Sequence, residues 1–238
     1  MSDTKNLPFK IDTQNELSNW RAETFFSKEP ETLAWLKEFA AREIPPLLLD
    51  IGANIGLYSL FYLSLKSTTE TISCEPFSEN IRLLEKNLEM NNFGTRAEIV
   101  KEPLSSVVEL GYAEISDTRP GGSGYVYKKF SGKEVTEPPT NASNIDSILS
   151  TESRRVIIKI DTDGSDFEIL CGAAKSLRDG NIDSVLIESS EHVQERIKIF
   201  LKKFGLIPDQ RFNSMDNHSD TRRINTGKTE RNRVYSKI

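Results

Sequence analysis

The clearest feature of the chain is a repeated alternation between short apolar runs and longer amphipathic stretches. Runs of four or five apolar residues have the length of buried strands, whereas apolar residues that recur every three or four positions predict helices. Strands that alternate with helices predict a parallel sheet with helices on both faces, an α/β fold of the Rossmann-like kind. The expected strands are residues 47–50, 71–74, 97–100, 156–160 and 184–187.

The expected helices each place apolar residues on one face. Ser27 is the expected N-cap of the first helix, with Pro30 in its first turn, and Ser78 is the expected N-cap of a later one. Gly180 is expected to end a single helix whose apolar face begins at Phe167. The helices are expected within residues 33–40, 57–65, 81–88, 145–149, 167–177 and 193–204.

The alternation breaks down between residues 105 and 143. Here residues 112–115 and 125–127 are expected to pair as a hairpin, and the glycine-rich residues 121–124 are expected to form its mobile tip. Near the end of the chain, Val234 and Tyr235 are expected to form a last edge strand.

These features suggest one main domain. We expect it to cover residues 31–238, with an inserted hairpin near 111–130 and a polar hairpin at the C-terminus. Residues 1–30 show weak periodicity and are expected to form a lead-in that packs over a ligand as a lid.

A tight turn with two glycines follows the first strand, in the order D-x-G-x-x-x-G from Asp50 to Gly56. Gly52 can adopt a positive φ and lets a ligand approach the backbone, and Gly56 leaves room where helix meets strand. The free N–H groups at the start of the next helix form an electropositive site for an anionic group. The turn therefore predicts a ligand site, although such a turn also joins a strand to a helix without any ligand.

The spacing of this turn indicates which ligand it binds. A dinucleotide fingerprint needs a glycine where the backbone meets the pyrophosphate, and this chain has Ala53 and Asn54 there. The carboxylate of Asp50 would repel a pyrophosphate but attract a cation. S-adenosylmethionine carries an ammonium, a sulfonium and one carboxylate, so it suits both Asp50 and the helix N-terminus. A nicotinamide-dependent oxidoreductase is disfavoured for the same reason.

Acidic residues follow four of the expected strands, namely Asp50, Glu75, Asp161 and Glu188. Ligands bind parallel sheets outside the carboxyl ends of the strands, so we expect these side chains to converge. Glu75, followed by Pro76, is expected to accept hydrogen bonds from the ribose hydroxyls of an adenosine, or else to be a solvated carboxylate. The residues expected to flank the adenine are Glu102, Leu104 and Ser105.

The candidates for chemistry lie around the turn that begins at Asp161. Asp161 and Asp163 can act as a general base, position a hydroxyl or bind a divalent metal, and Asp163 can equally be a helix cap. Lys159 lies in an apolar strand, where it needs a partner such as a carboxylate, and it can tune Asp161. His192 is a candidate general base, or a first-turn helix residue that faces water.

Composition changes this picture in a few respects. The net charge of −5 argues against a general nucleic-acid or membrane-surface binder. The longest apolar run ends at Lys66, too short for a membrane span, and the polar N-terminus does not resemble a signal peptide. Cys74 and Cys171 are expected to be reduced packing residues, so we expect a cytoplasmic protein.

Three blocks of the sequence resemble, in the right order, the signature blocks of the FkbM-type S-adenosylmethionine-dependent methyltransferases. They are LLLDIGANIGLYSL from residue 47, ISCEPFSENIRLLEKNLEMNN from residue 72, and VIIKIDTDGSDFEILCGA from residue 156. Residues 121–124 are similar to a glycine–serine turn that is common between the second and third blocks. The resemblance covers residues 32–190 and implies a class I methyltransferase fold, with a seven-stranded, mostly parallel sheet and an antiparallel last hairpin.

The resemblance also implies a reaction, O-methylation, typically of sugar or polyketide hydroxyls, and therefore a small-molecule or glycan acceptor. It places Asp161 at the acidic position that ends the fourth strand. Where the family usually has V-E-G, residues 162–164 are T-D-G, which shortens the acid there. The cofactor-binding positions of the family are occupied by Asp50, Gly52, Asn54, Gly56 and Glu75.

We therefore expect methyl transfer by direct displacement, with no metal and with Asp161, Lys159 and His192 as the catalytic candidates. Two alternatives stay open, namely a metal-assisted enzyme in which Asp161 and Glu188 hold a divalent ion, and a non-catalytic protein that binds the cofactor. The full set expected to bind the cofactor adds Ala53, Pro76, Glu102, Leu104 and Asp161 to the positions named above.

Overall fold

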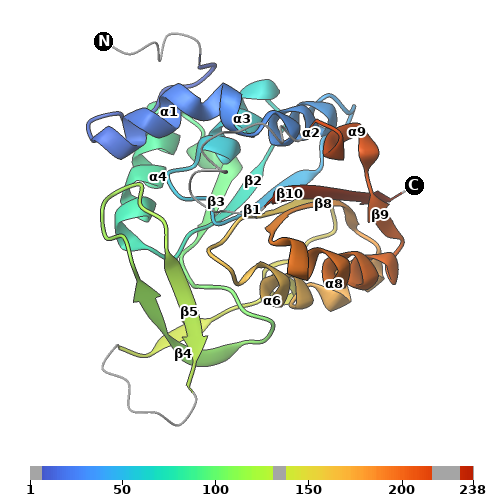
Figure 1. Cartoon of the computed structure of the whole chain (residues 1–238). Helices are drawn as coiled ribbons and strands as arrows, with labels where there is room; N and C mark the ends of the chain where they lie inside the picture. The colour runs from blue at the N-terminus through green and yellow to red at the C-terminus, as the bar shows by residue number, and fades with distance from the viewer. Residues whose placement is uncertain (1–6, 131–137, 216–230, 238) are drawn as a thin grey trace.

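The computed structural model describes residues 7–130, 138–215 and 231–237. Its centre is a seven-stranded sheet in the order β3-β2-β1-β7-β8-β10-β9 (Figure 1). The pairings from β3 to β8 are parallel, and β10 is antiparallel to both of its neighbours. The mostly parallel sheet with an antiparallel last pair is therefore confirmed. These strands are β1 (Leu47–Ile51), β2 (Thr71–Cys74), β3 (Ala97–Val100), β7 (Val156–Ile160), β8 (Ile182–Ser189), β9 (Leu206–Pro208) and β10 (Arg231–Lys237).

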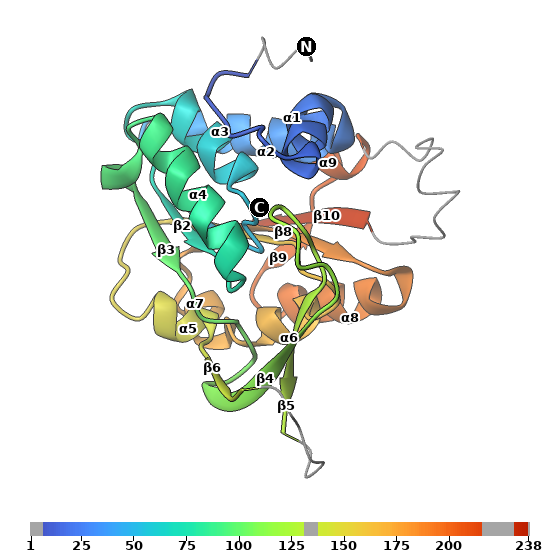
Figure 2. The ribbon, with the colours of Figure 1, turned by 90° about the vertical axis from the view of Figure 1, so that its left-hand side faces the viewer.

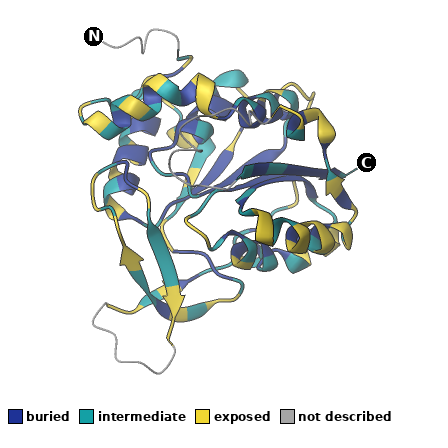
Figure 3. Ribbon diagram, viewed as in Figure 1, coloured by how far each residue is buried: buried dark blue, intermediate teal, exposed yellow. Residues whose placement is uncertain are grey.

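Helices cover both faces of the sheet, as the alternation predicted (Figures 1 and 2). One apolar cluster joins strand residues such as Leu48 and Leu186 to α1–α4 and α9, and a second joins Leu49 and Val185 to α5–α8. Neighbouring strand residues point to opposite faces of the sheet, so each central strand is buried on both of its faces by the two helix layers (Figure 3). The helices are α1 (Glu16–Lys28), α2 (Pro30–Ala40), α3 (Leu57–Leu65), α4 (Ser78–Met90), the 3₁₀ turn η2 (Gly94–Arg96), α5 (Ile145–Ile148), α6 (Asp166–Cys171), α7 (Ala174–Asp179), α8 (Glu191–Lys202) and α9 (Gln210–Asn213).

The last strand is not at an edge of the sheet, which corrects the prediction for Val234 and Tyr235. β10 lies between β8 and β9, and the three-residue β9 forms the edge. Buried polar side chains of β10 make hydrogen bonds that connect this polar strand to other elements. Asn232 donates to Glu31 Oε1 (3.0 Å), and Ser236 Oγ lies 2.9 Å from Ser184 Oγ.

The N-terminal region contains a regular helix that its weak periodicity did not predict. Ser27 lies inside α1, so its expected role as an N-cap is wrong. The side chain of Asn15 caps α1 instead, by accepting a hydrogen bond from the Ser18 N–H (2.8 Å). α2 begins at Pro30, a position that needs no N–H donor.

The helix expected over residues 167–177 is two helices, α6 and α7. The break lies at Gly172, where a Cβ atom would come within 2.7 Å of the Ser105 carbonyl oxygen. The Gly172 carbonyl also leaves the helical pattern and accepts a hydrogen bond from the Asp146 N–H (2.9 Å). Tertiary contact therefore interrupts a helix that its apolar spacing describes as continuous.

The predicted hairpin is confirmed and belongs to a separate three-stranded sheet. β4 (Glu109–Ile115) pairs antiparallel with both β5 (Tyr125–Lys129) and β6 (Thr140–Ala142). This sheet projects from the end of the central one, and much of it is exposed (Figure 3).

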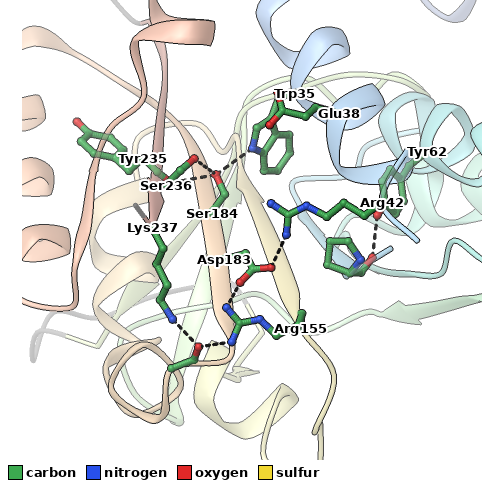
Figure 4. Close-up of polar contacts among 12 residues, drawn as sticks. Trp35, Glu38, Arg42, Tyr62, Arg155, Asp183, Ser184, Tyr235, Ser236 and Lys237 are labelled. Carbon is green, nitrogen blue, oxygen red and sulfur yellow. Dashed lines mark hydrogen bonds and ion pairs between the residues drawn. The ribbon is translucent and has the colours of Figure 1, made fainter. Parts of the chain in front are cut away.

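A polar cluster at the start of β8 connects the ends of several elements (Figure 4). The buried carboxylate of Asp183 accepts hydrogen bonds from Arg42 (2.8 Å) and Arg155. Trp35 Nε1 donates to Ser184 Oγ (3.0 Å), which ties α2 to the same strand. The cluster lies at the amino ends of β7 and β8, away from the ligand side of the sheet.

Candidate active site

A cavity of about 640 Å³ opens at the carboxyl ends of the parallel strands. Its walls come from the ends of β1, β2, β7 and β8, from α1, and from the loop between β4 and β5. This volume lies within the range of about 300–1,000 Å³ that is usual for ligand sites. The residues of the predicted cofactor set that line it are Gly52, Asn54, Glu75, Pro76, Glu102, Leu104 and Asp161.

The glycine turn between β1 and α3 is packed too closely for side chains at either glycine. Gly52 has φ +77°, and a Cβ atom there would lie 2.0 Å from the Asp161 carbonyl oxygen. Gly56 has φ +90°, and its Cβ would lie 2.4 Å from the side chain of Leu84. The first glycine therefore lets the turn meet the end of β7, and the second lets α3 meet α4. Gly56 does not line the cavity.

A small recess of about 50 Å³ adjoins the cavity at the N-terminus of α3. Ala53 and Leu57 line it on the side of the turn, and the ammonium-bearing side chains of Lys28 and Lys159 also border it. Unpaired N–H groups at a helix start, together with two cations, favour an anionic group. The electrostatics of the recess thus suit a carboxylate.

Glu75 is held at the end of β2 by three donors. Its Oε2 accepts the Asn54 N–H (2.8 Å), and its Oε1 accepts the Phe77 N–H (3.0 Å) and a longer bond from Asn80 Nδ2 (3.4 Å). Burial raises the pKa of the Glu75 carboxyl, against the lowering effect of these bonds. Ser78 is the first residue of α4, and Phe77, which precedes it, is the N-cap without a side-chain cap, so the expected N-cap role of Ser78 is wrong.

The glycine-rich loop at residues 121–124 is anchored over the cavity, where a mobile tip was expected. Asn54 Nδ2 and Asn80 Nδ2 both donate to the Gly122 carbonyl (2.7 and 3.1 Å). Asn80 Oδ1 accepts the Gly121 N–H (2.8 Å), and Asp163 accepts the Gly124 N–H. Figure 2 shows this loop reaching from the hairpin toward α1. Asn80 was not predicted, because a polar residue in a helix carries no signal of a distant partner.

α1 forms another wall of the cavity. Leu17, Trp20, Arg21 and Lys28 all line it, and Arg21 Nε donates to the Gly121 carbonyl (2.8 Å). The helix and the glycine-rich loop therefore hold each other in place. This position is the one that a lid would need, and the role of lid stays a prediction.

Lys159 lies at the centre of a buried charge network. Its Nζ is 2.8 Å from Asp161 Oδ2, 3.9 Å from Asp50 Oδ1 and 4.7 Å from the ring centre of Tyr58. The expectation that this lysine needs a carboxylate partner is thus confirmed. Burial would lower the pKa of Lys159, but the two carboxylates outweigh it and raise that pKa.

The side chain of Asp50 does not lie at the ligand site, where the sequence predicted it. Its carboxylate is fully buried, accepts a hydrogen bond from Ser59 Oγ (2.7 Å), and does not line the cavity or the recess. Asp50 is still inside β1, so its side chain points into the layer of α3 rather than out of the sheet end. The structure therefore places the Asp50 carboxylate beside Lys159 and outside the cavity, where the predicted direct contact with a cationic ligand is not formed.

Asp161 and Glu188 provide the carboxyl groups of the cavity at the ends of β7 and β8. Ile160 pairs with Ile187 in the register of β7 and β8, so Asp161 and Glu188 are neighbours at the ends of the two strands. Burial disfavours the charged form of Asp161, but Lys159 and Lys28 outweigh it and hold the pKa of Asp161 low. Burial and the charge of Asp161 raise the pKa of Glu188 well above its ordinary value.

The sequence model of the family described as the methyltransferase FkbM domain matches residues 50–223. The chain belongs to the FkbM methyltransferase family. It is an S-adenosylmethionine-dependent methyltransferase with the Rossmann-like class I fold. No curated protein sequence matches the chain.

Solved structures with the same fold are distant in sequence. The human methyltransferase 10 domain-containing protein has a TM-score of 0.52 at 10% identity, with 98% of this chain and 91% of that chain covered. The N-terminal domain of human METTL16, in complex with SAH, has a TM-score of 0.53 at 14% identity, with 98% and 78% covered. At such identities the likeness shows the fold alone.

The charges around the cavity of this FkbM methyltransferase fit S-adenosylmethionine. Carboxyl groups line the cavity at Glu75, Asp161 and Glu188, and the recess beside α3 is lined by the three cations Arg21, Lys28 and Lys159 and by Asp161. A ligand with cationic groups, a ribose and one carboxylate matches that distribution.

His192 is not part of the site of the FkbM methyltransferase. It is exposed on the first turn of α8 and does not line the cavity, which agrees with the alternative of a first-turn helix residue that faces water. Within the described ranges, no group of three or more His, Cys, Asp or Glu residues is arranged to hold a metal ion. In the same ranges, no helix is both long and apolar enough to cross a membrane.

Proposed function

We propose that this enzyme O-methylates a hydroxyl group of a small-molecule or glycan acceptor of the sugar or polyketide type. The observation that carries the proposal is the carboxylate of Asp161, which is 26% exposed, lines the cavity and is kept ionised by Lys159. A hydroxyl becomes a good nucleophile only if a base takes its proton, and a carboxylate that opens to the cavity can do so.

The cofactor would lie along the ends of β1, β2 and β3. Glu75 would accept hydrogen bonds from the ribose hydroxyls, and Pro76, Glu102 and Leu104 would flank the adenine. The methionine carboxylate would enter the recess at the N-terminus of α3, beside Ala53. The cofactor supplies an electrophilic methyl group when bound.

The protein's contribution to catalysis would be alignment and proton acceptance. α1 and the glycine-rich loop form two walls of the cavity, and with the ligands bound they would limit the access of water and hold the acceptor hydroxyl in one orientation. Asp161 would accept the hydrogen bond of that hydroxyl, and Lys159 would fix the position of Asp161. Alignment of this kind is worth about 7–11 kcal/mol of the barrier in well-oriented reactions.

Replacing Glu75 by glutamine should weaken S-adenosylmethionine binding by about 10–100-fold, because hydrogen bonds to charged groups are worth roughly 1.5–3 kcal/mol. The amide keeps an acceptor oxygen for one of the two backbone donors, Asn54 and Phe77, and the other donor loses its partner, so the stability of the variant is measured as well. Isothermal titration calorimetry measures the affinity, and thermal unfolding checks the fold. Unchanged affinity in a folded variant would remove Glu75 from the ribose site.

The acceptor class can be tested by a transfer screen with labelled S-adenosylmethionine. Glycans, nucleotide sugars and polyketides should include substrates, whereas structured and single-stranded RNA should not, since the net charge of −5 opposes binding to phosphate backbones. Mass spectrometry of the product should locate the methyl group on a hydroxyl oxygen. Turnover with RNA or an amine, and none with any hydroxyl, would refute the proposal, with Asp161→Asn as the matched inactive control.

A further inference from the structure

Asp161 and Glu188 bring two carboxyl groups together in the cavity, because they lie at the ends of the paired strands β7 and β8, where Ile160 is opposite Ile187. Two ionised carboxylates have only acceptor oxygens and repel each other, so such a pair favours holding one proton. The pair is therefore a monoanion with a shared proton when nothing is bound. Both groups line the cavity, and Asp161 lines the recess as well.

The surroundings decide where the charge and the proton reside. Lys159 Nζ is 2.8 Å from Asp161 and attracts the negative charge to that residue. Glu188 is largely removed from water and adjacent to the negative Asp161, and both effects favour its neutral form, so the proton resides on Glu188. A second cation brought into the cavity would change this balance, because positive charge favours the ionised form of both carboxyls.

We propose that the sulfonium of S-adenosylmethionine, when it binds beside Asp161, expels the proton shared by Asp161 and Glu188 and so prepares the pair to accept the proton of the acceptor hydroxyl. The cofactor position assumed here follows from Asp161 lining both the cavity and the recess for the methionine carboxylate. The second half of the proposal rests on the proposed O-methylation.

The protons and charges balance over one cycle. On binding, the shared proton leaves to solvent, and the pair becomes a dianion beside one additional cation. During transfer, the O–H bond of the acceptor breaks and its proton goes to the pair, while the O–C bond forms and the S–C electron pair stays on sulfur. The sulfur is then neutral, and the pair is again a monoanion with one proton. The net reaction releases one proton, and it is the one lost on binding.

Other ionisable groups face the pair and take part in its titration. They belong to the α1–α2 junction, to β1, α3 and β7, and to the start of α6. On β10 the residue opposite Glu188 is Asn232, which carries no charge. These groups are Lys28, Glu29, Asp50, Tyr58, Lys159 and Asp166.

The test is the number of protons released on ligand binding. Isothermal titration calorimetry of the full-length enzyme at pH 7, in phosphate and in Tris, gives this number from the difference in buffer ionisation enthalpy. S-adenosylmethionine should release up to one proton more than S-adenosylhomocysteine, which has the same amino and carboxyl groups but a neutral sulfur. Glu188→Gln should abolish this difference, because its amide has no proton to lose.

A matched control removes a different carboxylate from the same cavity. Asp117 lines the outer part of the cavity and pairs with Arg119, so Asp117→Asn should keep the wild-type difference in released protons. Unchanged S-adenosylhomocysteine affinity and thermal unfolding would show that Glu188→Gln is folded. Equal proton release with both ligands in the wild type, or the same difference in Glu188→Gln, would overturn the inference. Failure of every hydroxyl acceptor in the transfer screen, with proton release intact, would instead refute only the proposed O-methylation.

Discussion

Replacement of Asp161 by asparagine should lower kcat for methyl transfer by about 10²–10⁴-fold, the usual contribution of a positioned general base. The asparagine side chain fills the same space but cannot take the proton of the acceptor hydroxyl. It also presents an amide toward Lys159, whose Nζ is now 2.8 Å from a carboxylate oxygen. Single-turnover measurements with saturating acceptor and cofactor separate this loss from any change in binding.

Asp163→Asn is the comparison that identifies which acid of the turn acts as the base. Asp163 also lines the cavity, but it is exposed and its carboxylate holds the Gly124 N–H of the glycine-rich loop. We expect this variant to lose much less activity, no more than about tenfold, or roughly 1.4 kcal/mol. If both variants lose activity equally, or if Asp161→Asn changes only KM, Asp161 is not the base.

The sequence predicted the parts of the site that depend on local order along the chain. Gly52 and Gly56 follow a buried strand and precede an apolar helix, and this order is sufficient to place a ligand turn. The parallel topology then brings Glu75, Asp161 and Glu188 together at the carboxyl ends of the strands, although they are far apart in sequence. Both inferences need only the strand–helix alternation, which the apolar pattern shows clearly.

Features that depend on a single position within an element were harder to predict. Asp50 and Asp161 both belong to the carboxyl ends of neighbouring strands, but Asp50 is the fourth residue of β1 and Asp161 follows the last residue of β7. That offset decides whether a side chain points into the helix layer or into the cavity. Strand boundaries drawn from hydrophobicity alone do not fix such an offset, so Asp50 was expected in the cavity that Asp161 lines and Asp50 does not.

Long-range polar contacts could not be predicted from the sequence for a different reason. Asn80 joins the glycine-rich loop to Glu75, and Arg21 joins α1 to the same loop, through hydrogen bonds between residues 41 and 100 positions apart. Asparagine and arginine are common on solvated helix faces, so neither residue stands out from its neighbours. The polar β10 was predicted to be an edge strand on similar grounds, because the acceptors for the Asn232 amide N–H groups lie on the distant helix α2.

Lys159→Met should destabilise the protein by about 3–5 kcal/mol, which is the usual cost of removing one partner from a buried ion pair. Methionine fills much of the space of the lysine, so the loss comes from charge and not from a void. Asp50 is fully buried and Asp161 is close beside it, and without the ammonium two carboxylates face each other. Urea unfolding monitored by circular dichroism measures the change, with an unaltered m-value as the sign that the denatured state is the same.

The pH dependence of this loss distinguishes charge from packing. The pKa of Lys159 is raised above 10.5, so its contribution is complete below that pH and disappears as the pH rises through the folded-state value. The pKa of Asp161 is lowered below 3.8, so its contribution is complete above that pH and disappears as the pH falls. The difference between wild type and Lys159→Met should therefore be largest between these limits and should shrink in acid, where the unpaired carboxylates take up protons.

Lys175→Met is the matched control, because Lys175 forms an exposed i,i+4 pair with Asp179 (2.9 Å) on α7. Exposed pairs of this kind contribute about 0.3–0.5 kcal/mol, so this variant should be almost as stable as the wild type at every pH. A loss in Lys159→Met that is as small as in Lys175→Met, or one that is constant from acid to neutral pH, would contradict a network held together by charge. In that case Lys159 would contribute only packing between β1 and α3. Its charge would then not be what keeps Asp161 ionised in the cavity.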